Sequence, residues 1–267
     1  MSENATRAAG ADTGSSTAPS GAASPGAASP GAAAAGGAPI LVAIDGPAGS
    51  GKSSVSREAA SRLEFGILDT GAAYRSLAWS AQRLGLDLDD AAAVENLLDV
   101  WSYEITMVGE QRVTVVLPGT GETCDVTAEI REPAVSVQVS RVSKHPAVRD
   151  RLNDMFRRLV AESELPGVVI EGRDITTVVA PDAPVRILLT ASPEVRAQRR
   201  AGELPGASPE QVLENLRLRD EKDALVVDFF NPAPGVTLVD TSDLNFEQSV
   251  RAVIDVVRAA QADAEKS

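Results

Sequence analysis

The chain has 267 residues, 43% of them hydrophobic, which is enough for one sizeable core or for one core with an inserted subdomain. Its 38 acidic residues outnumber its 25 lysines and arginines, and the net charge of −13 argues against a long nucleic acid as a partner. A single cysteine, Cys124, and a single histidine, His145, exclude a disulfide framework, a Cys/His zinc site and a histidine-activated nucleophile. We expect His145 to be a solvated loop residue.

Residues 1–38 are almost entirely Ala, Gly, Ser and Pro and include the repeat GAASPGAASPGAAAA. Such a segment has no large apolar residues to offset the entropy of ordering, so we predict a disordered tail followed by one domain over 39–267. No run reaches the ~18 apolar residues of a membrane helix, and the tail lacks the features of a signal peptide. We therefore expect a cytoplasmic protein without a membrane segment, and, because no large exposed apolar face is evident, a monomer.

Short apolar runs alternate with helical patterns along the rest of the chain. The helices are predicted from Lys52 to about Arg62 and over 72–85, 91–101, 133–143, 146–162, 193–202, 208–225 and 245–261. The buried strands are predicted over 40–45, 65–71, 167–172, 185–190 and 235–241. This alternation predicts a three-layer α/β domain with a five-stranded parallel sheet.

One segment interrupts the alternation. Residues 103–109 and 112–119 alternate in polarity around Glu110 and Gln111, which predicts an antiparallel hairpin with a two-residue turn. Residues 122–126 are a candidate third strand. We expect a small antiparallel sheet inserted into the parallel domain.

The segment Gly46–Ser53 matches G-x-x-x-x-G-K-[ST] between a predicted strand and a predicted helix, which indicates a phosphate-binding loop. Backbone N–H groups would converge on the β-phosphate, Lys52 would reach the β/γ oxygens and Ser53 would hold Mg²⁺ bound to ATP. The predicted ATP-binding residues are Gly46, Pro47, Ala48, Gly49, Ser50, Gly51, Lys52, Ser53 and Ser54. The chain lacks a downstream N-K-x-D guanine motif and any second repeat, so a small-molecule kinase fits better than a switch GTPase or a motor.

Three further stretches suggest a second substrate. LDTGAAYR (68–75) places Arg75 near a helix start, where it suits a phosphate, although a surface arginine is the commoner reading. In VIEGRDITTVV (169–179), Glu171, Arg173 and Asp174 follow a buried strand, where ligands of α/β sheets bind. Arginines cluster again within 196–219, as expected for a mobile lid over a phosphoryl group or for a solvated charged helix pair.

These stretches, together with SRVSKHPAVR and LRLRD, resemble the bacterial cytidylate kinases in order and spacing from Ile40 to the end of the chain. The resemblance implies a P-loop kinase fold with a monophosphate-binding insertion at about 97–150 and a short helical lid at about 196–226. It also implies transfer of the ATP γ-phosphoryl group to CMP or dCMP.

The resemblance assigns roles to individual residues. Ser140, Arg149 and Asp174 would hold the base, Arg75 and Arg173 the monophosphate, and Arg219 and Asp223 the sugar and phosphate end. The implied CMP site comprises Thr70, Tyr74, Arg75, Ser140, Arg149, Arg173, Asp174, Arg219 and Asp223. The implied catalytic residues are Lys52, Arg173 and Arg219, and the implied lid arginines are Arg196, Arg199 and Arg200.

The chain departs from the family pattern at two positions. Val226 stands where the family usually has arginine, and Thr176 stands where it usually has glycine, adding bulk near the base pocket. The lid is also a few residues short. Two alternatives therefore remain open: another small kinase that acts on UMP or AMP, and a catalytically weakened nucleotide-binding relative.

We predict that Val226→Arg lowers the KM for CMP, because valine cannot neutralise a phosphate whereas arginine can. Steady-state kinetics with ATP and Mg²⁺ measure this. An unchanged KM would mean that Val226 does not limit acceptor binding.

Overall fold

The computed structural model describes residues 39–203, 208–224, 231–264 and 266 of the chain. The tail predicted over 1–38 and Val226 lie outside these residues. So do the side chains of Lys222 and Asp223, although α8 includes both positions.

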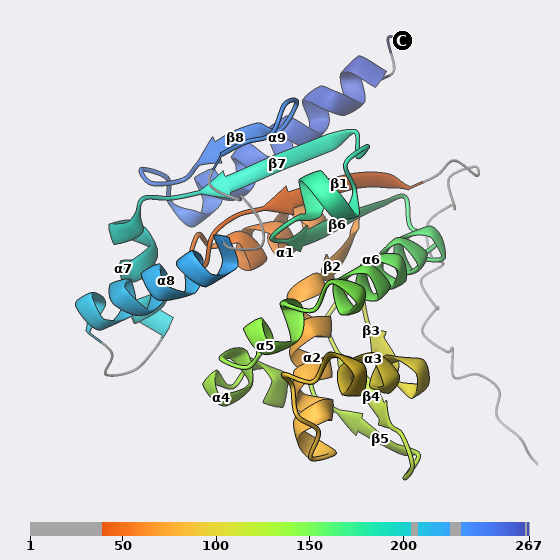
Figure 1. Cartoon of the computed structure of the whole chain (residues 1–267). Helices are drawn as coiled ribbons and strands as arrows, with labels where there is room; N and C mark the ends of the chain where they lie inside the picture. The colour runs from red at the N-terminus through yellow and green to blue at the C-terminus, as the bar shows by residue number, and fades with distance from the viewer. Residues whose placement is uncertain (1–38, 204–207, 225–230, 265, 267) are drawn as a thin grey trace, which may run out of the picture. The chain divides into compact units, whose positions relative to one another are not determined.

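A five-stranded parallel sheet forms the centre of the domain, as predicted (Figure 1). Its strands run in the order β2-β6-β1-β7-β8, and every neighbouring pair is parallel. Their bounds are Ile40–Asp45 (β1), Gly66–Asp69 (β2), Gly167–Gly172 (β6), Val185–Thr190 (β7) and Thr237–Asp240 (β8). The strand order brings together the carboxyl ends of β2, β6 and β1, which are distant in sequence.

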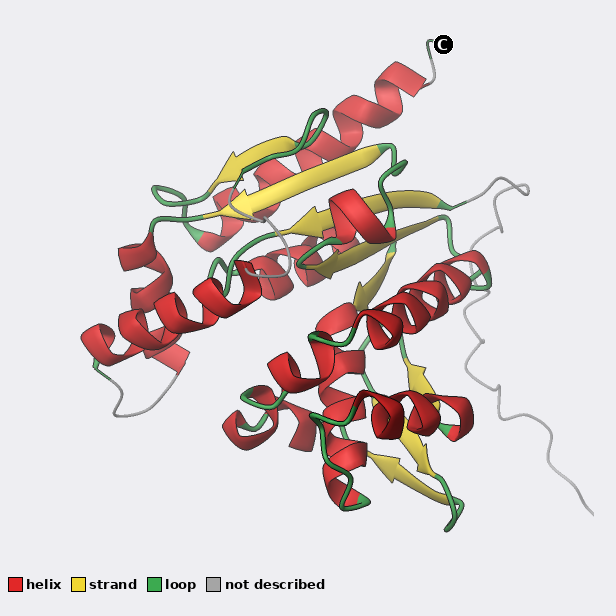
Figure 2. Ribbon diagram, viewed as in Figure 1, coloured by secondary structure: helices red, strands yellow, loops and turns green. Residues whose placement is uncertain are grey.

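Helices cover both faces of this sheet (Figure 2), because its strands are apolar on both sides. Val42 and Ile44 of β1 join one core cluster with α1 (Lys52–Arg62) and α9 (Phe246–Ala264). Ala43 faces the other way and joins a second cluster with α2 (Thr70–Arg83) and α6 (Pro146–Ala161). The alternation of side chains along a strand thus produces the three layers.

Between α2 and α6 the chain forms α3 (Ala91–Val100) and a three-stranded antiparallel sheet. The sheet is formed by β3 (Ser102–Ile105), β4 (Val113–Leu117) and β5 (Glu122–Asp125), in that order. After the sheet come the short helices η1 (Glu129–Arg131), α4 (Pro133–Ser136) and α5 (Val139–Ser143). The single helix expected over 133–143 is therefore wrong, because the structure divides it into α4 and α5.

The two-residue turn predicted at Glu110 and Gln111 is also wrong. The link between β3 and β4 is longer, and its backbone serves other partners: the Met107 carbonyl accepts a hydrogen bond from the Ile67 N–H of β2 (2.9 Å). Gln111 is buried and Gly109 has φ +76°. The link thus contacts β2 of the parallel sheet before the chain enters β4. The polarity pattern of β3 and β4 does not reveal this contact.

Three helical segments complete the fold at the carboxyl ends of the strands. A π-helical turn, η2 (Ile175–Val179), follows β6 directly. The helices α7 (Pro193–Glu203) and α8 (Pro209–Ala224) follow β7 and pack against each other (Figure 1). We refer to these two helices as the α7–α8 pair; both were predicted within a few residues of their bounds.

Candidate active site

The phosphate-binding loop connects β1 to α1 and depends on glycine at three positions. Gly49 and Gly51 have φ of +75° and +83°, in the left-handed region that other residues avoid. At Gly46, an added Cβ would lie 2.1 Å from the Leu189 carbonyl oxygen of β7. The three glycines allow the chain to turn tightly at the end of a buried strand.

Carboxylates stand at the carboxyl ends of three adjacent strands and organise the cations around the loop. Glu171 of β6 is 2% exposed and forms an ion pair with Lys52. The Ser53 hydroxyl donates to the other oxygen of the same carboxylate (2.7 Å). Glu171 therefore contacts both loop side chains that are expected to serve a triphosphate.

Asp69, the last residue of β2, does the same for Arg75. Its carboxylate accepts from the Arg75 guanidinium (2.8 Å) and from the Ala72 N–H (3.0 Å), so it also caps α2. Burial raises the pKa of Asp69, but the charges of Arg75 and Lys52 outweigh burial and hold this pKa below its ordinary value. The carboxylate is ionised and fixes the Arg75 head group at the start of α2.

Arg149 of α6 and Asp174, the second residue after β6, form a third pair (2.8 Å). Both side chains are mostly buried, and Tyr74 lies nearby, its own pKa raised by burial. Arg173, one residue earlier, donates to the Gly46 carbonyl of the loop (2.9 Å). Residues 173–174 therefore contact both the phosphate-binding loop and helix α6.

Asp45, the last residue of β1, holds the π-helical turn that follows Asp174. Its two oxygens accept from the backbone N–H groups of Ile175 and Thr176 (2.8 Å each), and one also accepts from the Thr176 hydroxyl (2.6 Å). Thr176 is 4% exposed and is absent from the cavity wall described below. The hydroxyl of Thr176 is bound to Asp45, and the expected effect of its bulk near the base pocket stays a prediction.

The α7–α8 pair binds the backbone of Ala48 in the phosphate-binding loop. Arg196 of α7 donates to the Ala48 carbonyl (2.9 Å) and forms a buried ion pair with Asp220 of α8, and Asp220 accepts from the Ala48 N–H (3.3 Å). Around them, Ala48, Ala197, Val212 and Leu216 form a small apolar cluster. Both backbone groups of Ala48 are therefore bound by the α7–α8 pair.

The arginines predicted to form the lid have different positions. Arg196 is 6% exposed and contacts the loop from behind, and Arg199 donates to the carbonyls of Ser50 and Thr241 (3.1 and 2.7 Å). Burial lowers the pKa of Arg199. Neither lines the cavity, whereas Arg200 does. The helical spacing alone could not separate the arginine that faces the cavity from the two that support the loop.

One cavity of about 1150 Å³ brings most of the predicted site together. On the donor side it is lined by Pro47, Ala48, Gly49, Ser50, Gly51, Lys52, Ser53 and Ser54. On the acceptor side it is lined by Thr70, Tyr74, Arg75, Ser140, Arg149, Arg173, Asp174 and Arg219. Gly46 is buried behind this wall, and the side chain of Asp223 lies outside the described residues.

Sequence reasoning gave no site role to several side chains that organise the cavity. Asp45, Asp69 and Asp220 were not singled out as ligand-positioning groups, and Glu171 was noticed only as part of a charged cluster. Asp45, Asp69 and Glu171 share one signal, a carboxylate at the end of an apolar strand. Asp220 offers no such signal, because it stands among alternating charges on a helix.

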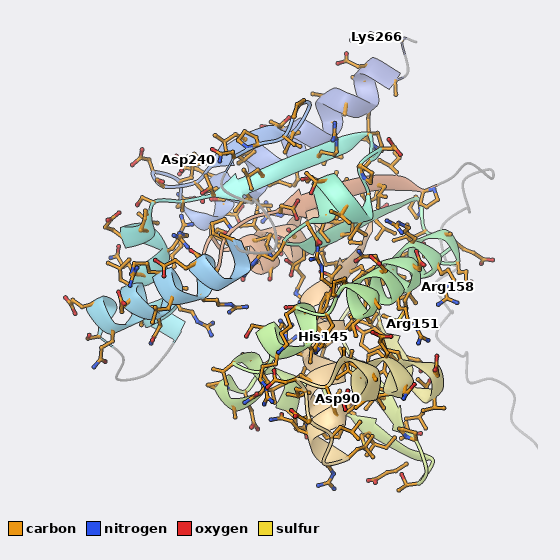
Figure 3. The ribbon with its side chains drawn as sticks, in the orientation of Figure 1. Asp90, His145, Arg151, Arg158, Asp240 and Lys266 are labelled. Atoms are coloured by element: carbon orange, nitrogen blue, oxygen red, sulfur yellow. The ribbon has the colours of Figure 1, made fainter. Side chains whose placement is uncertain are left out.

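His145, labelled in Figure 3, is not a solvated residue as expected. It is 7% exposed, precedes α6, and its Nε2 lies 2.8 Å from the Leu88 carbonyl oxygen. Next to it, Arg141 and Lys144 form ion pairs with Asp89. These contacts attach the segment that carries Ser140 to the loop before α3.

The family model for cytidylate kinase matches residues 42–259 of the chain. The chain belongs to the cytidylate kinase family. It is 44% identical to the cytidylate kinase of Cutibacterium acnes over 223 residues, which are 82% of this chain and 96% of that protein. The cytidylate kinase of Rhodococcus jostii is 45% identical and that of Streptomyces avermitilis 41% identical, covering 82% and 84% of this chain and 94% of each relative.

Among solved structures, the shikimate kinase of Bacteroides thetaiotaomicron aligns with a TM-score of 0.40 at 12% identity, over 82% of this chain and 98% of that one. This likeness is too distant to support an argument about the site. Among the described residues, the chain forms no helix with the length and apolar character needed to span a membrane.

We predict that Thr176→Val destabilises the fold by about 1.5 kcal/mol near pH 7, because Asp45 loses a hydroxyl donor. Burial raises the pKa of Asp45 and the Thr176 hydroxyl lowers it, so the variant raises this pKa further. A folded-state pKa above the unfolded value favours folding at low pH, and this contribution is lost as the pH rises. In denaturant unfolding, the variant's deficit in stability should therefore grow as the pH rises above the ordinary titration range of an aspartate.

The exposed neighbour Thr177→Val is the matched control and should change the free energy of unfolding by less than about 0.5 kcal/mol. A deficit that shrinks with rising pH would contradict this role for Thr176.

We predict that Asp220→Asn lowers the free energy of unfolding by about 3 kcal/mol and raises the KM for ATP, because it leaves Arg196 buried without its carboxylate and loosens the loop. Denaturant unfolding and ATP titration in a kinase assay measure both effects. Glu221→Gln removes an exposed carboxylate paired with Arg217 and should leave both unchanged. A loss of stability with an unaltered KM for ATP would show that the pair holds the helices without serving the loop.

Proposed function

We infer that the chain transfers the γ-phosphoryl group of ATP to CMP or dCMP, giving ADP and CDP or dCDP. The observation that carries this inference is that a phosphate-binding loop and the family's acceptor residues line a single cavity of about 1150 Å³. Membership of the cytidylate kinase family supports the choice of acceptor.

On the donor side, the loop would bind the triphosphate through its backbone N–H groups and Lys52. Lys52 forms an ion pair with Glu171, so a phosphate oxygen has to replace that carboxylate as its partner. Lys52 would exchange one anionic partner, the Glu171 carboxylate, for another, the phosphate. The exchange keeps a buried cation paired throughout.

Mg²⁺ would accompany ATP, and Ser53 is the residue we propose to hold it. The hydroxyl of Ser53 is an oxygen ligand of the kind that Mg²⁺ prefers, and the side chain is exposed to the cavity beside the Glu171 carboxylate. The ion would neutralise charge on the phosphates. The protein's own contribution is to keep Ser53 oriented, which the 2.7 Å hydrogen bond to Glu171 does.

On the acceptor side, the arginines Arg75, Arg173 and Arg219 are the proposed monophosphate ligands. Arg75 and Arg173 are held by Asp69 and by the Gly46 carbonyl, so their head groups are positioned before the acceptor binds. A fixed guanidinium binds a phosphate with less loss of side-chain entropy than a free one.

Ser140, Arg149 and Asp174 are the proposed base ligands. The carboxylate of Asp174 can accept from the exocyclic N4 amine of cytosine, and Arg149 can donate to N3 or O2. Their 2.8 Å ion pair orients both groups on one wall. Uracil presents an acceptor where cytosine presents this amine, so the same wall should discriminate against UMP.

Catalysis by such a site would consist of positioning and charge neutralisation. The attacking oxygen of a monophosphate is already ionised, so no strong general base is required. Lys52, Arg173 and Arg219 would stabilise the charge on the transferring group. Arg200 of the α7–α8 pair also lines the cavity and is the remaining candidate for a lid arginine. Excluding water by closure would limit competing hydrolysis of ATP.

The proposed partners are small molecules, ATP and a cytidine monophosphate, and we propose a cytoplasmic monomer. Two alternatives are a kinase for UMP or AMP and a nucleotide binder with weakened activity. An assay of ADP release with ATP and Mg²⁺ across CMP, dCMP, UMP and AMP separates them. Absence of acceptor-dependent turnover would contradict the kinase function, and a preference for AMP would contradict the assignment of the base.

We predict that Asp174→Asn raises the KM for CMP about tenfold or more and narrows the preference for CMP over UMP, because an amide can accept from the cytosine amine through its oxygen or donate to the uracil carbonyl through its NH2 group. Asp182→Asn is the matched control, since this aspartate is exposed just beyond the π-helical turn. Initial rates at varied CMP and UMP measure both. An unchanged ratio of kcat/KM for CMP to kcat/KM for UMP would contradict a role for Asp174 in recognising the base.

A further inference from the structure

Two arginines and a glutamine, none of which has a role in the proposed function, lie together at one wall of the cavity. Arg57 belongs to the second turn of α1, Gln111 precedes β4, and Arg131 ends η1. All three line the main cavity, and Gln111 and Arg131 also line an adjoining depression of about 680 Å³ on the insertion. The group therefore stands where the two spaces meet.

Gln111 is the centre of this group and is only partly satisfied. It is 6% exposed, and its Oε1 accepts from Arg57 Nη2 (2.9 Å) and from Arg131 Nη2 (3.3 Å). Its Nε2 is buried and has no hydrogen-bond acceptor within the part of the chain that the structure describes. A buried amide donor without an acceptor is costly and rare in folded proteins.

The two arginines also differ from three other cations of the cavity. Lys52, Arg75 and Arg149 each form an ion pair with a carboxylate. Across residues 39–203, 208–224, 231–264 and 266, no carboxylate makes such a pair with Arg57 or Arg131, and Glu110 on the same wall is no exception. Two guanidinium groups share one neutral oxygen.

This combination defines the chemistry of a ligand. Two cations and one unsatisfied N–H donor call for several acceptor oxygens with negative charge, which a phosphate group supplies. Arg57 is five residues beyond Lys52 on the same helix, so its Cα lies roughly 7 Å further along the axis at 1.5 Å per residue. The group is therefore displaced from the phosphate position that the loop serves.

We propose that Arg57, Gln111 and Arg131 form a second phosphate-binding subsite, which takes a phosphate group other than the one transferred. The phosphate comes either from a free anion such as pyrophosphate or from a polyphosphate chain on a nucleotide in the cavity. Bound there, it joins α1 of the parallel domain to the insertion. The subsite does not depend on CMP being the acceptor.

Calorimetric titration with pyrophosphate tests the first source, using the full chain saturated with Mg²⁺ and the non-hydrolysable analogue AMP-PNP so that the loop is occupied. We expect one pyrophosphate per chain and about tenfold weaker binding in Arg131→Gln, because one charge-assisted contact is lost. Arg151→Gln is the matched control: this exposed arginine of α6 pairs with Asp99 and lines neither space, so its loss should leave the affinity for pyrophosphate unchanged.

Gln111→Glu is the second variant. It keeps the shape of the side chain and gives both arginines a carboxylate, so the fold should be retained while the subsite rejects phosphate. Retained pyrophosphate binding in this variant would overturn the proposal.

Inhibition by CDP and CTP tests the second source. If the phosphate is carried by a nucleotide, pyrophosphate does not bind the AMP-PNP complex, but inhibition by CTP weakens about tenfold in Arg131→Gln while the KM for CMP stays unchanged. Absence of both effects would overturn the proposal. If CMP is not a substrate, the titration with pyrophosphate still tests the subsite. A failure of the proposed function can therefore be told apart from a failure of this proposal.

Discussion

The site depends on the pairing of cavity cations with carboxylates at the ends of adjacent strands. Asp69 and Glu171 sit in register on β2 and β6, and they hold Arg75 and Lys52. Parallel strands end at one edge of a sheet, so the order β2-β6-β1 places the acidic residues at their carboxyl ends side by side. In a chain with a net charge of −13, these pairs decide where positive charge is presented.

The same edge links the loop to the parts around it. Asp45 holds the turn after β6, Arg173 reaches back to Gly46, and the α7–α8 pair binds the backbone of Ala48. The loop is thus supported from the β6 side and from the β7 side by hydrogen bonds that do not involve Lys52 or Ser53. A change of partner by Lys52 or Ser53 would therefore leave these supporting hydrogen bonds intact.

Much of this architecture could be predicted because it is local. The five strands are short apolar runs, and the loop has a fixed spacing of Gly, Lys and Ser. What failed depends on tertiary neighbours: Arg196 looks like any charged helical residue until Asp220 and Ala48 surround it, and His145 looks solvated until the Leu88 carbonyl covers it. The bond between Thr176 and Asp45 could not be foreseen for the same reason, since the two are 131 residues apart. Polar residues buried by distant partners leave no periodic pattern in the sequence.

The lack of a side chain at Gly46 affects more of the structure than the loop in which it lies. Its neighbour at 2.1 Å would be a backbone carbonyl of β7, which cannot rotate away as a side chain could. Any larger residue would have to part β1 from its neighbour β7, and β7 leads directly into α7 and Arg196. The first glycine of the loop therefore constrains the spacing of the sheet and the position of the α7–α8 pair, as well as the turn in which it lies.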